Sequence, residues 1–170
     1  MLSKIEKLID AEDWPRARKA VRDELRSSPT SHWLLTRLAL TYYEERRYKL
    51  ALKYSLKALA EAPNCPLALW DYAGALEMLD QPQAALSVFL HLIRRGIRPI
   101  AFGDCGDGLA SARGLIADCH YRRASCYVAL RRPKMAIKAF KTHLALRGAG
   151  CRSIYSIAEV RKELGELEAG

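Results

Sequence analysis

The stretch LALTYYEERRYKLALKYSLKALAEAP, residues 38–63, decides the fold because both of its halves follow a helical hydrophobic pattern. Upstream and within it, one apolar stripe of an amphipathic helix comprises Leu35, Leu38, Ala39 and Tyr42. After a short polar link at residues 45–47, a second stripe comprises Ala51, Leu52, Ser55, Leu56 and Leu59. Pro63 ends the pattern, because proline cannot continue a helix. The stretch therefore predicts two antiparallel helices joined by a tight turn.

The same pattern recurs along the chain at a fixed interval. Ala51 lies 34 residues after Ala17 and 34 before Ala85. Neighbouring positions keep this interval, as in the triplets Leu8/Tyr42/Leu76, Trp14/Tyr48/Pro82 and Val21/Ser55/Phe89. A further copy is displaced by 51 residues, which takes Ala85 to Ala136 and Phe89 to Phe140. One insertion of 17 residues explains every displacement, so the chain is predicted to consist of helical repeats.

These copies resemble the tetratricopeptide repeat, a 34-residue helix–turn–helix with small residues where its two helices cross. The resemblance implies an all-α fold, an α-solenoid of about four antiparallel helix pairs with a C-terminal capping helix, in a single domain over residues 1–170. One departure is Arg123, which replaces the large apolar residues Leu38 and Tyr72. The expected repeats are about 1–30 (truncated), 31–64, 65–96 and 117–148, with an insertion at 97–116 and the capping helix at 152–168.

Composition sets the expected class and location of the protein. Lys and Arg total 28 against 19 Asp and Glu, a net charge of +9 that favours acidic partners. The first ten residues, MLSKIEKLID, lack the apolar core of a signal peptide, and no apolar run is long enough to span a membrane. The five cysteines are an odd number, so we expect reduced thiols and a cytoplasmic protein.

The resemblance also implies where a partner binds, because the first helix of each pair lines a concave wall in such solenoids. Aromatic and Arg residues, which dominate binding energy at interfaces, lie off the core stripe of these helices. The predicted function is an adaptor that binds a protein or peptide, an acidic one included, without catalysis or cofactor. The predicted groove residues are Trp33, Thr36, Arg37, Leu40, Tyr43, Trp70, Asp71, Glu77, Tyr121, Arg122 and Ser125.

A second surface supplies an alternative function. Basic residues recur on the second helices, in three groups: Arg16, Arg18, Lys19 and Arg22; Lys49, Lys53 and Lys57; Lys134, Lys138 and Lys141. Such a face suits an acidic partner or nucleic acid. Because no aromatic residues interleave with it for base stacking, a solvated face without a partner is favoured over nucleic acid.

The insertion raises a third set of hypotheses, carried by Asp104, Cys105, Asp107, His120 and Arg123. Arg123 lies on a core stripe and needs a partner, so we expect the loop to bring Asp104 or Asp107 to it. A metal site would use Cys105, Cys119, His120 and Cys126, and a small hydrolase would pair Cys105 with His120. The sequence lacks a Cys-x-x-Cys spacing and offers no oxyanion site, so a structural or docking loop is favoured over both.

Overall fold

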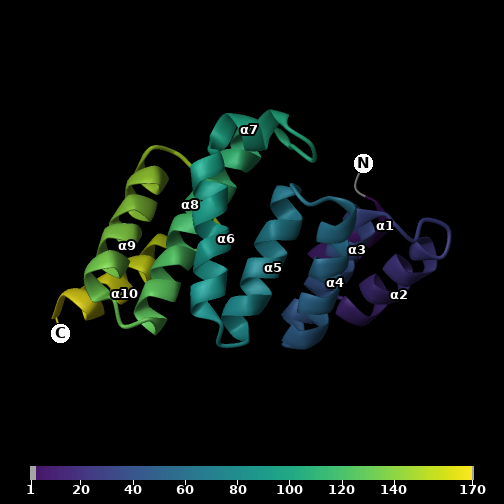
Figure 1. Ribbon diagram of the computed structural model, residues 1–170, viewed down its shortest axis with the longest axis horizontal. Helices are drawn as coiled ribbons and strands as arrows, with labels where there is room; N and C mark the ends of the chain where they lie inside the picture. The colour runs from purple at the N-terminus through teal and green to yellow at the C-terminus, as the bar shows by residue number, and fades with distance from the viewer. Residues whose placement is uncertain (1–2, 170) are drawn as a thin grey trace. The chain divides into compact units, whose positions relative to one another are not determined.

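The computed structural model describes residues 3–169, which form ten helices and no strand (Figure 1). The chain divides into two compact units, residues 1–80 and 81–170. The first unit holds α1 (Lys4–Asp10), α2 (Trp14–Leu25), α3 (His32–Glu44), α4 (Tyr48–Glu61) and α5 (Pro66–Met78). The second holds α6 (Pro82–Arg95), α7 (Ile97–Phe102), α8 (Gly108–Ala129), α9 (Pro133–Gly148) and α10 (Ile157–Ala169).

Polar caps and prolines set where these helices begin. Ser3 accepts a hydrogen bond from the Glu6 amide while the Glu6 carboxylate accepts one from the Ser3 amide, a capping box at the start of α1. Asp13 and Ser31 each cap a helix, α2 and α3, with a single side-chain acceptor. The helices α5, α6 and α9 begin at a proline. Proline lacks an N–H, which costs nothing there because N–H groups of the first turn have no acceptor within the helix.

In the first unit, consecutive helices pack against each other as pairs. Contacts join α1 to α2, α2 to α3, α3 to α4 and α4 to α5. Ala17 and Ala51, the predicted small positions, are fully or almost fully buried. The core around them contains Ile5, Val21, Leu38 and Tyr42, and the last two occupy the predicted stripe of the first helix. The prediction of antiparallel helix pairs is confirmed in this unit (Figure 1).

The second unit repeats this packing around its longest helix. α8 contacts α6, α7 and α9, and α10 packs on α9 as the final helix. Ala85 and Ala136 are buried, as are the aromatic rings of Phe89 and Phe140. The insertion is more regular than expected, because its first six residues form α7, which buries Ile100 and Ala101. The helix that follows, α8, is 22 residues long and begins inside the expected insertion.

Backbone geometry gives independent support for the repeat register. Four non-glycine residues with positive φ, Glu12 (53°), Arg46 (59°), Asp80 (59°) and Arg131 (55°), sit at equivalent places in the four copies. Each follows the first helix of its copy. The residue after Arg46 and the residue after Arg131 each donate a backbone hydrogen bond to the carbonyl five positions earlier, both at 2.8 Å. This left-handed helix stop is therefore part of the repeat itself.

Candidate functional site

Trp33 and Arg37 form an aromatic–guanidinium pair one turn apart on α3. The guanidinium carbon of Arg37 lies 5.4 Å from the centre of the Trp33 ring, within range of a cation–π interaction. Both side chains are half-buried, so the pair is held in place but retains accessible surface. Such a pair offers a flat apolar face and a charged edge to a ligand.

Leu40 and Tyr43 continue along the same helix, and both are half-buried. Tyr43 meets Tyr48 edge to face, with ring centres 5.4 Å apart. Thr36 differs from the expectation that it faces a partner, because it is only 1% exposed. Its hydroxyl donates to the Trp33 carbonyl oxygen at 2.7 Å, so it supports the helix that carries the Trp33–Arg37 pair.

Three predicted groove residues lie on α5, and all are half-buried: Trp70, Asp71 and Glu77. Burial raises the pKa of Asp71 to about 8, and the positive charge of Arg37 opposes this shift. Asp71 is therefore largely protonated at neutral pH and can donate a hydrogen bond. The first unit thus combines aromatic surface on α3 with an unusual carboxylic acid on α5.

Tyr121 of α8 is committed to contacts within the second unit. Its ring stacks on Tyr155 with centres 3.8 Å apart, and its hydroxyl donates to Glu163 of α10 at 2.8 Å. Ser125 donates a long bond to the Tyr121 carbonyl oxygen, at 3.5 Å. The guanidinium carbon of Arg122 lies 5.8 Å from the Phe89 ring centre. Tyr121 therefore anchors the end of the chain rather than presenting a free ring.

The expected ion pair of Arg123 does not form. In residues 3–169, neither Asp104 nor Asp107 pairs with its guanidinium, and the buried Nε atom lacks a hydrogen-bond partner. Asp107 instead accepts from the Ser111 hydroxyl at 2.9 Å at the start of α8. Burial lowers the pKa of Arg123 below its usual value, since a charge away from water is disfavoured.

The sulfur and imidazole groups considered for metal binding are dispersed over different environments. Cys119 and Cys126 are fully buried, Cys105 is exposed, and all five cysteines are free of disulfides. Burial raises the pKa of the Cys119 thiol, which keeps it protonated and a poor nucleophile or ligand. Burial also lowers the pKa of His120 to about 4, with help from the charge of Arg123.

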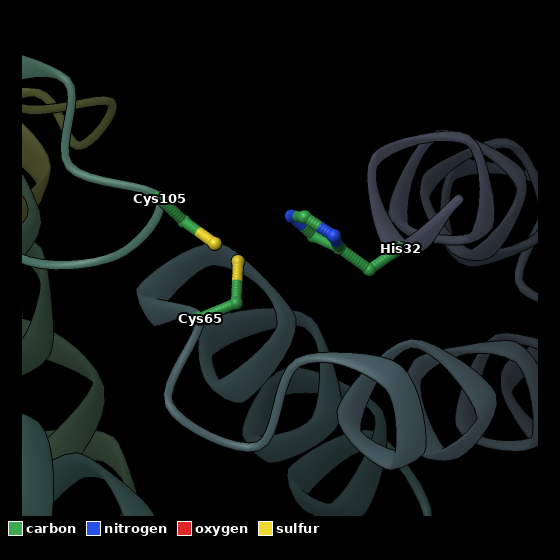
Figure 2. A group of neighbouring side chains, drawn as sticks. All are labelled: His32, Cys65 and Cys105. Atoms are coloured by element: carbon green, nitrogen blue, oxygen red, sulfur yellow. The ribbon is translucent and has the colours of Figure 1, made fainter. Parts of the chain in front are cut away.

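A further histidine and cysteine approach each other within the first unit. Figure 2 shows the side chains of His32, at the start of α3, and Cys65, just before α5, turned toward one another. An imidazole nitrogen of His32 and the sulfur of Cys65 lie within 4.8 Å. Figure 2 also draws Cys105, which belongs to the second unit. Two donors are half of the four that a structural zinc ion takes, so the His32–Cys65 pair alone does not define a metal site.

The sequence interpretation missed a buried polar cluster in the second unit. His143 is fully buried, its Nδ1 atom is 2.7 Å from the Ala117 carbonyl oxygen, and its Nε2 atom has no partner. Asp118 is also buried, which raises its pKa, and it borders an open cavity of about 300 Å³ together with Ile154. A repeat comparison could have found His143, because Ala58 and Leu92 occupy the equivalent positions.

Paired helices with buried small residues at their crossings, a repeated left-handed stop and a terminal packing helix define a helical-repeat protein. Residues 34–65 match a family model described as the tetratricopeptide repeat. The resemblance drawn from the sequence is thus confirmed over these residues, and the expected α-solenoid fold is confirmed by the likeness of the chain to solved structures. No curated protein matches the chain. None of the helices described, within residues 3–169, has the length and apolar character needed to cross a membrane.

Solved structures share this fold at low sequence identity. A crystal structure of MamA superposes with a TM-score of 0.70 at 18% identity, covering 100% of this chain and 85% of that one. MamA from Desulfovibrio magneticus RS-1 gives a TM-score of 0.74 at 14% identity, covering 97% and 80%. TTC0263, a thermophilic tetratricopeptide-repeat protein of Thermus thermophilus, gives 0.51 at 14%, covering 98% and 96%. At these identities the likeness concerns the fold.

Proposed function

We propose that this protein is a non-enzymatic adaptor that binds a segment of another protein on the α3–α5 face of its first unit. The observation that carries the proposal is the half-buried Trp33–Arg37 cation–π pair, next to which the Thr36 hydroxyl donates a hydrogen bond to the Trp33 carbonyl oxygen. Tryptophan and arginine are the residues most often found at binding hot spots, particularly where their geometry is already fixed before binding. Leu40, Tyr43 and Trp70 extend the proposed surface.

Asp71 suits such a surface because its carboxyl group can act as a hydrogen-bond donor when protonated and as an acceptor when ionised. In the free protein its raised pKa keeps the carboxyl group largely protonated at pH 7, so it can donate to a backbone carbonyl of a bound peptide. A ligand that brings a positive charge would instead favour the carboxylate. Arg122, Tyr121 and Ser125 belong to the second unit, and in our proposal they serve its internal packing first.

The experiment is an affinity capture that compares the wild type with three variants, each shown by circular dichroism to be folded. Trp33→Ala and Arg37→Ala remove the two halves of the cation–π pair. Leu56→Ala is the matched control, because Leu56 is an exposed apolar residue on the neighbouring helix α4. We expect a partner that is retained by the wild type and by Leu56→Ala to be lost by both α3 variants, with about a tenfold or larger loss of affinity. Equal retention by all four forms would exclude this surface.

A further inference from the structure

The net positive charge of this protein lies mostly in its second unit. Residues 1–80 contain 13 Lys and Arg against 12 Asp and Glu, whereas residues 81–170 contain 15 against 7, a net charge of +8 from 15 − 7. Within the second unit, the forty residues 119–158 include nine Lys and Arg and neither Asp nor Glu. The basic faces predicted on the second helices of the two units therefore differ in the negative charge around them.

The two links between paired helices account for part of this difference. Residues 44–49 read EERRYK, and the equivalent residues 129–134, 85 positions later, read ALRRPK. The three cations are kept, while Glu44 and Glu45 are replaced by Ala129 and Leu130. The turn is also kept, since Arg46 and Arg131 share a left-handed conformation and the next residue donates an equivalent backbone hydrogen bond.

In the first unit, an acidic residue of the link is used within the fold. Glu45 receives two hydrogen bonds from the Arg18 guanidinium, at 2.7 and 2.8 Å, and this partner lowers the pKa of Glu45. In the second unit, the residue equivalent to Arg18 is Leu86, which is buried. A buried apolar side chain therefore stands where the first unit has an ion pair. The second link thus keeps its cations but lacks the carboxylates that neighbour them in the first.

We define the 128–138 face by six exposed side chains: Val128, Arg131, Arg132, Lys134, Met135 and Lys138. Val128 is 43% exposed and Met135 is 46% exposed, while their equivalents Tyr43 and Leu50 in the first unit are half-buried. In the part of the chain that the structure describes, the four cations of this face form no ion pair. One turn further along α9, Lys141 pairs with Glu168 at 2.6 Å and marks where the face ends.

We propose that the 128–138 face binds an acidic amphipathic segment of another protein. Carboxylates of such a segment would pair with Arg131, Arg132, Lys134 and Lys138, and arginine favours carboxylates through its two parallel donors. Aliphatic side chains of the segment would cover Val128 and Met135, and methionine adapts readily to such contacts. A nucleic acid would leave the two apolar side chains unused and would find no aromatic ring for base stacking among the six residues.

The test uses a labelled synthetic peptide of about 18 residues, five helical turns, with Glu and Leu at amphipathic spacing, and a scrambled peptide of the same composition. Binding is measured by fluorescence anisotropy with the intact protein. Lys134→Glu/Lys138→Glu is the test variant, and Lys49→Glu/Lys53→Glu is the matched control at the equivalent positions of the first unit. Lys134→Gln/Lys138→Gln is a milder second variant, and circular dichroism checks all three.

We expect the charge reversal in the second unit to weaken binding of the amphipathic peptide about tenfold, and the matched control to change it less than about twofold. Met135→Ser should weaken it about threefold, because the apolar contact is lost. The scrambled peptide should bind more weakly than the amphipathic one. Equal losses from both charge reversals, or equal binding of both peptides, would overturn the proposal. Tighter binding of an oligonucleotide or of vesicles containing anionic lipid than of the amphipathic peptide would also overturn it.

Discussion

The hydroxyl of Tyr121 donates a hydrogen bond to the Glu163 carboxylate at 2.8 Å and thereby ties α8 to α10. Burial of Tyr121 raises the pKa of its hydroxyl, and the hydrogen bond to the Glu163 carboxylate raises this pKa further. The hydroxyl therefore keeps the proton that it donates. Tyr155, in the segment between α9 and α10, stacks on the same ring. The final helix is thus attached to the repeat through an aromatic residue that also contacts Phe140 and His143.

Tyr121→Phe should lower the free energy of unfolding by about 1 kcal/mol, because the hydrogen bond to a charged acceptor is lost while the ring stacking remains. Urea denaturation followed by circular dichroism measures the change. The control is a double-mutant cycle with Glu163→Gln, in which we expect a coupling energy of about 0.5–1 kcal/mol. Fully additive losses in the cycle would show that the two side chains do not interact in solution.

Replacing Arg46 by glycine should raise the free energy of unfolding by about 0.5 kcal/mol. A residue with a Cβ atom is strained at its φ of 59°, whereas glycine is not, although glycine also adds freedom to the unfolded chain. Arg46→Val should lower stability by about 1–2 kcal/mol, because a β-branched residue fits the left-handed region poorly. Lys53→Gly, in the middle of α4, is the control and should cost about 1 kcal/mol. A loss of stability in Arg46→Gly would contradict the role assigned to this turn.

Arg123→Leu restores the apolar residue found at the equivalent positions of the earlier repeats. Since the structure gives Arg123 no carboxylate partner and burial disfavours its charge, we expect the variant to be more stable by about 1 kcal/mol. Thermal denaturation of the variant is compared with that of Arg113→Leu, an exposed position on the same helix where little change is expected. A destabilised Arg123→Leu variant would mean that the guanidinium has a partner in solution.

Acidification should destabilise the protein in part through His120. Its pKa in the folded protein is about 4, below the unfolded value of 6.5, so between these values the unfolded chain binds the additional proton. The contribution of His120 is therefore fully present above about pH 6.5 and is lost as the pH falls toward 4. His120→Leu should flatten this part of the stability profile, measured by urea denaturation at a series of pH values.

His91, which is exposed on α6, provides the control for this profile. His91→Gln should leave unchanged the slope of unfolding free energy against pH between pH 4 and 6.5. This is the range in which the lowered pKa of His120 changes the stability. If His120→Leu and the wild type have the same slope, His120 is not buried as a neutral group.

Much of the fold was predictable from the sequence because each repeat position has one physical requirement. Ala17, Ala51, Ala85 and Ala136 lie where two helices cross, and only a small residue fits there, so the register could be counted. The insertion occurs only once in the sequence, so it could not be aligned with another copy. Its helix α7 contains Pro99, and its apolar residues are too few to define a period, so a loop was expected there.

The candidate site was less predictable, because a helix has two polar flanks and the periodicity does not say which one is covered. Thr36 and Tyr121 both lie off the central stripe, yet the first is buried against its own helix and the second is covered by Tyr155 and Glu163. Tyr155 and Glu163 lie more than thirty positions from Tyr121 in the sequence, beyond the reach of any local pattern. Trp33 and Arg37 were easier to pair, since residues four apart on one helix are neighbours.

The shared turn at Arg46 and Arg131 has a consequence for how such proteins can change. Both links keep the left-handed residue and the hydrogen bond that follows it, although the charge of the side chains around this turn differs between the two copies. Exchanging EERRYK and ALRRPK would also require exchanging Arg18 and Leu86, because Glu45 pairs with Arg18 whereas Leu86 is buried at the equivalent place. The charge of a link can therefore differ between copies of the repeat that share the same backbone turn.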